Sequence, residues 1–205
     1  MGSSFKEQIR KVKEREAYIS YELYRLLRNA IIRRLVYEDS RCEFKEVLPE
    51  FPVGDKRADL VVFATRYGGA TQPFLVIEVK VRAYARPGPS MAKAVKRART
   101  YAVNLGATPT PFFAVYDGWE LMVFRNISPY LIGVYGAIKD EYQARNLLLG
   151  LEEFSYKGER EILDKLPKHA DPDFLIKRIL PFIARELARD PSEAERFRKS
   201  WLQLI

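Results

Sequence analysis

Two runs of β-branched and aromatic residues lie near the middle of the chain: RADLVVF at residues 57–63 and FLVIEVKV at residues 74–81. Turn-forming residues bound each run, and this combination is typical of a β-strand. Glycines at positions 68 and 69, followed by Pro73, separate the two runs. The sequence therefore predicts two adjacent strands joined by a short connection.

Charged residues interrupt both runs. Asp59 lies in the first run, and Glu78 and Lys80 lie in the second. Side chains alternate between the two faces of a strand, so Glu78 and Lys80 are expected on the same face. Burying such charges is costly unless they are paired or bind a metal. Three explanations of these charged residues are compatible with the pattern: a buried Glu–Lys ion pair, a solvated face of an edge strand, and a metal site.

The composition limits the chemistry. The chain has 205 residues, enough for one domain, or for a core domain with a helical appendage. A single cysteine, Cys42, excludes an internal disulfide and a cysteine-cluster metal site. A single histidine, His169, excludes a multi-histidine zinc site and argues against a histidine-based triad. Any metal must therefore be held by carboxylates, which favours Mg²⁺ or Mn²⁺.

The charge balance favours a polyanionic partner. The formal net charge is +8, which suits nucleic acid or another anionic surface, although ordinary solubility charge would give the same sign. No apolar run approaches the roughly 20 residues of a membrane span, and the N-terminus lacks the apolar core of a signal peptide. We therefore expect no membrane association and a cytoplasmic location.

The order of predicted elements indicates an α/β fold with a central mixed β-sheet flanked by helices. One or two helices are expected over residues 5–36. The later elements are strands at 43–51, 57–63, 74–81, 111–116, 119–125 and 130–136, a helix at 90–105, and helices at 139–152, 159–166, 173–189 and 191–204. The first three strands are expected to form an antiparallel meander. The chain divides into a core at 1–136 and a C-terminal helical extension at 137–205, which packs on the core or mediates association.

A basic helix follows the second charged strand. Residues 90–105 carry a narrow face of small apolar residues suited to packing on a sheet, and a second face that includes Tyr101. Four basic residues and no acidic residue lie in this segment: Lys93, Lys96, Arg97 and Arg99. A solvated helix face is the ordinary explanation of such a run. Because no acidic residue in this segment balances the positive charge, contact with phosphates is favoured instead.

Two glutamates of the first predicted helix are candidates for a site. Glu16 lies within the apolar stripe of this helix, and Glu22 borders the stripe. An ion pair between Glu22 and Arg25, one turn further on, is the alternative explanation for Glu22.

The residue types at positions 59, 78 and 80 suit metal-dependent phosphodiester hydrolysis. Two carboxylates can hold Mg²⁺ through hard oxygen ligands. The metal polarises the phosphate and lowers the pKa of the attacking water. A lysine beside the metal can orient that water or neutralise the charge that builds up on the phosphate.

The sequence resembles the PD-(D/E)XK nuclease superfamily and, more closely, the N-terminal nuclease domain of type I restriction enzyme motor subunits and its stand-alone relatives. The resemblance covers roughly residues 15–125 and implies a restriction-endonuclease-like core. Its motifs are GDKRAD at 54–59, LVIEVK at 75–80, Tyr-Ala at 101–102, and Asp-Gly at 117–118 before an aromatic-rich strand. Two residues depart from the pattern: Ala58 replaces a proline, and Arg97 replaces a glutamine that often precedes the helix tyrosine.

The resemblance implies roles for individual residues. Asp59 and Glu78 would be metal ligands, with the backbone carbonyl of Val79 as a third. Lys80 would be the catalytic lysine, and Glu22 would position a metal-bound water or a second metal.

The expected function is a Mg²⁺-dependent (or Mn²⁺-dependent) nuclease acting on DNA. The residues expected to contact nucleic acid are Arg57, Lys93, Lys96, Arg97 and Tyr101. A second copy of the chain, or other subunits of a restriction or repair system, are the candidate protein partners. The alternatives are a catalytically inactive nucleic-acid-binding or assembly module on the same fold, and an unrelated protein in which Glu78 and Lys80 form a core ion pair.

Overall fold

The computed structural model describes residues 5–33, 42–66, 69–81, 87–106, 109–126, 130–157, 184, 188 and 191–202. In chain order the elements are α1 (Phe5–Ile32), β1 (Cys42–Val53), β2 (Lys56–Arg66), β3 (Thr71–Val79), α2 (Pro87–Asn104), β4 (Phe112–Tyr116), β5 (Glu120–Arg125), β6 (Tyr130–Gly136), α3 (Glu141–Lys157) and α6 (Pro191–Leu202). The predicted helix at 159–166 lies outside these residues, as does the helix at 173–189 apart from positions 184 and 188.

The six strands form one mixed sheet in the order β1-β2-β3-β4-β5-β6. The first three strands are antiparallel neighbours, as the sequence predicts. β3 and β4 run parallel because α2 carries the chain back to the starting end of the sheet. β5 and β6 then continue antiparallel. The predicted α/β class with a central mixed sheet is therefore confirmed.

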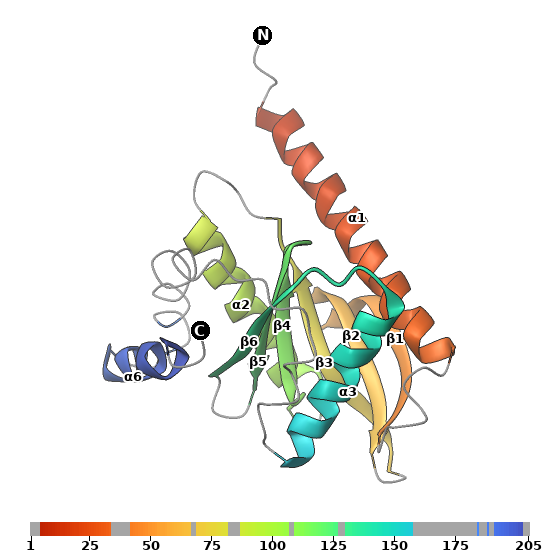
Figure 1. The fold of residues 1–205 in the computed structure, drawn as a ribbon. Helices are drawn as coiled ribbons and strands as arrows, with labels where there is room; N and C mark the ends of the chain where they lie inside the picture. Colours follow the sequence, from red (N-terminus) through yellow and green to blue (C-terminus); the bar gives the residue numbers. More distant parts are fainter. Residues whose placement is uncertain are drawn as a thin grey trace.

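Helices cover both faces of the sheet (Figure 1). α1 and α3 share one apolar core with the sheet, and α2 packs into a second core on the opposite face. The alternation along β3 supplies both cores, since Leu75 and Ile77 join the first and Val76 joins the second. The predicted small-residue face of α2, which includes Val95 and Ala98, is buried in the second core. The residue after Ile77 on β3, Glu78, is therefore expected on the face that α2 covers.

α3 is an integral part of the first core. Five of its side chains are buried there: Ala144, Leu147, Leu148, Leu151 and Phe154. Its first residue, Glu141, accepts hydrogen bonds from Asn29 at 2.9 Å and from Arg33 at 2.7 Å, near the end of α1. The C-terminal extension thus begins with a helix packed on the core, and the division of the chain at residue 136 stays a prediction.

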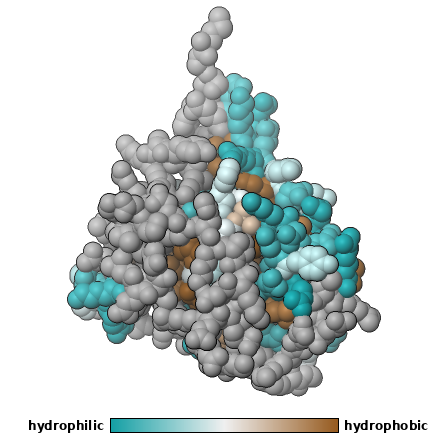
Figure 2. Space-filling view, in the orientation of Figure 1, coloured by the Kyte–Doolittle hydropathy of each residue, from teal (hydrophilic) through white to brown (hydrophobic). Residues whose placement is uncertain are grey.

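α1 is one helix and is longer than the sheet face it covers. Its N-terminal part extends past the sheet in Figure 1, and hydrophilic residues lie along it in Figure 2. Across the described parts of the chain, no helix is both long and apolar enough to cross a membrane.

Candidate active site

The two predicted carboxylates lie together at the end of β3. The β2–β3 register pairs Leu60 with Ile77, so the next residues on the two strands, Asp59 and Glu78, stand side by side. Asp59 Oδ2 accepts a hydrogen bond of 2.6 Å from the backbone N–H of Val79. The backbone pairing of β2 with β3 ends at Leu60 and Ile77, and the Asp59 side chain then binds the next free backbone N–H of β3. This contact fixes the Asp59 carboxylate beside Glu78.

Glu78 is buried at 1% exposure. Its Oε1 forms an ion pair of 2.8 Å with the Arg97 guanidinium of α2. Its Oε2 has no hydrogen-bond partner among the described residues. A buried carboxylate oxygen without a hydrogen-bond partner lowers the stability of the folded protein. Such an atom needs an explanation, and binding of a ligand by Glu78 is one.

Burial and the neighbouring carboxylate both make ionisation of Glu78 difficult. Burial, followed by the charge of Asp59, raises the pKa of Glu78 to about 8, although Arg97 and Lys80 favour the charged form. Burial also raises the pKa of Asp59 above its ordinary value, against the lowering effects of the Val79 amide and Arg97. Two carboxyl groups that resist ionisation in one desolvated place are a site where a cation would be strongly favoured.

Lys80 lies one residue beyond β3 and points to the first helix. Its backbone N–H donates to the carbonyl of Tyr116 on β4 at 2.9 Å. Its Nζ donates to Glu16 Oε1 at 2.6 Å, and Val81 N donates to the same oxygen at 3.3 Å. The strand ends at Val79, so the two-residue alternation that predicts a shared face with Glu78 no longer fixes the direction of Lys80. Lys80 is instead held by α1, whereas Glu78 is held by α2.

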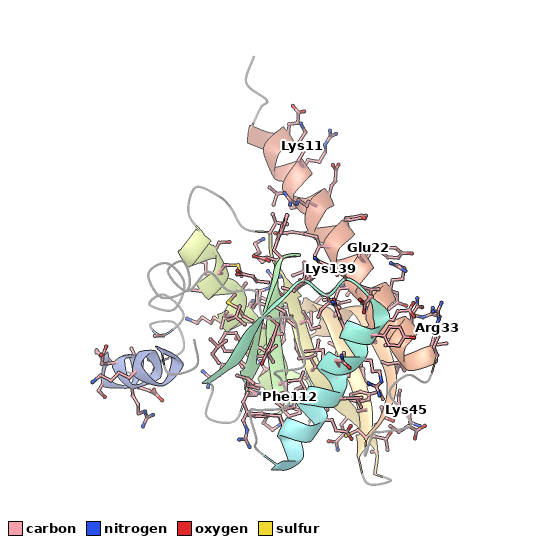
Figure 3. The ribbon with its side chains drawn as sticks, viewed as in Figure 1. Lys11, Glu22, Arg33, Lys45, Phe112 and Lys139 are labelled. Atoms are coloured by element: carbon pink, nitrogen blue, oxygen red, sulfur yellow. The ribbon has the colours of Figure 1, made fainter. Side chains whose placement is uncertain are left out.

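Glu16, and not Glu22, is the first-helix glutamate that contacts Lys80 in the described part of the chain. Glu22 pairs with Arg25 at 2.9 Å on the exposed side of α1 (Figure 3), which is the alternative interpretation that its spacing allowed. The sequence carries a signal for this difference, because Glu16 lies within the apolar stripe of the helix and Glu22 only borders it. An acid inside the stripe faces the protein and requires a buried partner.

Arg97 and Tyr101 form a layer over Glu78 rather than an open surface. The Arg97 guanidinium carbon lies 5.8 Å from the Tyr101 ring centroid, and Tyr101 is only 3% exposed. The Arg97 side chain is half exposed, so one side of its guanidinium can reach a ligand while the other side binds Glu78.

The other predicted nucleic-acid contacts lie at the surface. Lys93 and Lys96 are exposed on α2, and Arg57 is exposed on β2. Only Arg97 among the predicted contacts bonds a predicted metal ligand in the described residues.

The donor set fits a hard divalent cation. Mg²⁺ in proteins is commonly held by one or two carboxylates with water and substrate phosphate completing the shell. Asp59 and Glu78 provide two such carboxylates, and Glu78 Oε2 is a buried oxygen without a partner in the described residues. No cluster of three or more histidine, cysteine, aspartate or glutamate side chains suited to a metal occurs in these residues.

Comparisons with known proteins give one structural likeness. No protein-family model matches the chain, and no curated protein matches it. A chain of the type IIG restriction endonuclease BpuSI aligns with 14% sequence identity and a TM-score of 0.39. The alignment covers 85% of this chain and 19% of that one, so this chain spans about a fifth of the length of that enzyme. At this identity and TM-score the likeness carries no argument about function.

Proposed function

We propose that the protein is a Mg²⁺-dependent nuclease that hydrolyses phosphodiester bonds in DNA. The observation that carries this proposal is the buried Glu78 carboxylate, which has an unpartnered oxygen and lies beside Asp59 at the end of β3. A structural ion pair would need only one carboxylate at this position. A second carboxylate in the same desolvated space raises the cost of both, and a divalent cation offsets that cost.

Each residue has a role in this proposal. Asp59 and Glu78 would hold Mg²⁺, with the Val79 carbonyl as a candidate third ligand. The bound metal would polarise the phosphate and make the attacking water more acidic. Lys80, oriented by Glu16, would donate a hydrogen bond to that water or to the phosphate oxygen that gains charge. Arg97 would move part of its hydrogen bonding from Glu78 to the phosphate.

The surroundings suit a polyanion. The chain carries a net charge of +8, and Lys93 and Lys96 lie exposed on the helix that also carries Arg97. Basic residues on one helix beside the carboxylates can hold the backbone of DNA through its phosphates, independently of base sequence.

A cleavage assay tests the proposal. Plasmid, single-stranded, flap and junction DNA are incubated with the protein in Mg²⁺ and in EDTA. Cleavage is expected only with the metal, and Asp59→Ala, Glu78→Ala and Lys80→Ala are each expected to abolish it. Glu43→Ala is the matched control, since Glu43 pairs with Lys45 on the surface of β1 and should keep full activity. Metal-dependent cleavage that persists in Asp59→Ala would refute the site.

An inactive nucleic-acid-binding module on the same fold is the second candidate. It is favoured by the pairing of Glu78 with Arg97 and of Lys80 with Glu16, because these contacts satisfy the charges without a metal. Calorimetric titration separates the two functions. A nuclease should bind Mg²⁺ or Mn²⁺ at millimolar concentration or below and lose this binding in Asp59→Ala. DNA binding without any metal binding would support the second candidate.

A further inference from the structure

An exposed tryptophan lies at the tip of the β4–β5 hairpin. Trp119 is 62% exposed, although tryptophan carries the largest apolar surface of any side chain. The hairpin belongs to the end of the sheet that holds the carboxylates, because the backbone N–H of Lys80 donates to the carbonyl of Tyr116, the last residue of β4.

The backbone of the hairpin tip is fixed by contacts with Asp117 and with α1. The buried Asp117 accepts hydrogen bonds through Oδ1 from the backbone N–H groups of Trp119 at 2.9 Å and Glu120 at 2.8 Å. Gly118 has a φ of +90°, and a Cβ added there would lie 3.0 Å from Ile19 Cδ1 of α1. The helix that holds Lys80 through Glu16 therefore also supports the hairpin through Ile19, one turn further on.

The tryptophan is close to the proposed chemistry. Trp119 follows Tyr116 by three positions, which is at most about 11 Å of chain. The Lys80 backbone, which bonds Tyr116, is about 5 Å further away, on the neighbouring strand. Successive bases along one strand of DNA are spaced by about 3.4 Å, so the backbone of Trp119 lies within on the order of five base steps of the Lys80 backbone. An exposed aromatic ring on a rigid support at this distance is suited to stacking against a nucleobase.

We propose that Trp119 is a stacking platform for an unpaired nucleobase of the DNA, next to the phosphate at Asp59, Glu78 and Lys80. This inference rests on the proposed nuclease function and adds the class of substrate. A base inside a duplex has both faces covered by its stacked neighbours. The base on the indole is therefore an unpaired one, and the preferred DNA carries a single-stranded tail, a flap or a frayed end beside the bond that is cut.

Binding measurements test the platform without relying on cleavage. In a Lys80→Ala background the metal ligands remain and the DNA stays intact. Trp201→Phe removes the only other tryptophan of the sequence, so that the tryptophan emission reports Trp119 alone. The probes are a short duplex, the same duplex with an unpaired tail, and the tailed duplex with abasic sites in the tail.

The tailed duplex is expected to quench the Trp119 emission, and the blunt duplex is not. Trp119→Ala should weaken binding of the tailed duplex by ~5- to ~150-fold, and Trp119→Phe should keep most of the affinity. The abasic tail should weaken binding to the Trp119 protein by the same factor and cause no further loss in Trp119→Ala. Tyr142→Ala is the control. Tyr142 is 68% exposed and adjoins Glu141, whose partner Arg33 lies about 25 Å along α1 from Glu16.

Two results would overturn the inference. The first is an equal loss of affinity for tailed and blunt duplexes in Trp119→Ala, which would indicate a general contact with paired DNA. The second is no loss for either. If cleavage still requires Asp59 and Lys80 in that case, only the platform is refuted. A protein that neither binds nor cuts any of the DNAs would refute the proposed function as well.

Discussion

Glu16 and Lys80 are 64 residues apart in the sequence, and their carboxylate and ammonium groups lie 2.6 Å apart. The same Glu16 oxygen also accepts a hydrogen bond from the backbone N–H of Val81. The first helix of the protein therefore determines where the proposed catalytic lysine points. This relationship gives α1 a part in the proposed chemistry that is separate from its part in the apolar core.

Glu16→Gln tests this relationship. The amide keeps the shape of the side chain but loses the charge that holds Lys80, so the cleavage rate is expected to fall by ~10- to ~100-fold. Single-turnover cleavage in saturating Mg²⁺ measures this rate. Glu22→Gln is the matched comparison and should have a much smaller effect, because Glu22 pairs with Arg25 on the exposed side of α1. A larger loss in Glu22→Gln than in Glu16→Gln would instead support the role at the metal that the family resemblance implies for Glu22.

Arg97→Ala should destabilise the metal-free protein. It leaves Glu78 buried without its cation, and the expected loss is about 1–3 kcal/mol, below that of a fully buried pair because the guanidinium is half exposed. Urea unfolding in EDTA, at a pH above the Glu78 pKa of about 8, measures the loss. Mg²⁺ should restore more stability to Arg97→Ala than to the wild-type protein. Lys93→Ala, on the exposed side of the same helix, is the control and should change the unfolding free energy little.

The pH dependence of stability should report Glu78. Its pKa is raised from 4.5 to about 8 in the folded protein, so between these values the folded state keeps a proton that the unfolded chain releases. The unfolding free energy of the metal-free protein should therefore fall as pH rises from about 4.5 to about 8, by at most about 5 kcal/mol from this group. Chemical unfolding of wild type and Glu78→Gln across this range measures the difference. Parallel curves for the two proteins would show that Glu78 ionises normally.

Gly118→Ala should reduce both stability and the proposed activity. Its φ of +90° disfavours any residue with a Cβ, and that Cβ would press on Ile19 of the helix that also carries Glu16. Gly54→Ala separates the two effects, because Gly54 also has a positive φ of +61° but open space around its Cβ. The cost of Gly54→Ala should be about 1–2 kcal/mol, with unchanged cleavage.

Removing the clash should restore part of the loss. Ile19→Val deletes the Cδ1 atom that a Cβ at position 118 would meet. In a double-mutant cycle of thermal unfolding and cleavage, Gly118→Ala should therefore cost less in the Ile19→Val background. Additive effects of the two substitutions would show that the hairpin and α1 are not coupled at this point.

Local patterns predicted most of the architecture. The alternation and the turn residues around positions 59 and 78 predicted adjacent strands, since antiparallel neighbours joined by a short connection are determined by local sequence. The small-residue face of α2 predicted its packing on the sheet for the same reason. Helical spacing also placed Glu16 within the apolar stripe and Glu22 at its border, although the resemblance favoured Glu22 for the site.

Contacts between distant segments were not predictable in this way. Glu16 is the partner of Lys80 because of the position of α1 along the sheet. No local sequence pattern determines that position. Arg97 belongs to a run of basic residues that suggested phosphate binding, and its pairing with Glu78 appears only once α2 is docked over the end of β3. The direction of Lys80 depended on the strand ending at Val79, two residues before the predicted end at position 81.

The spatial order of the six strands is also their order in the sequence. During synthesis, each new strand can therefore pair with the strand that left the ribosome just before it. α1 is made first, yet its far end is tied to Glu141 of α3 by Asn29 and Arg33, across 112 and 108 residues. The contacts of Asn29 and Arg33 with Glu141 can thus form only after the whole sheet and the start of α3 exist. The last contacts of the helix that holds Lys80 would therefore form late in synthesis.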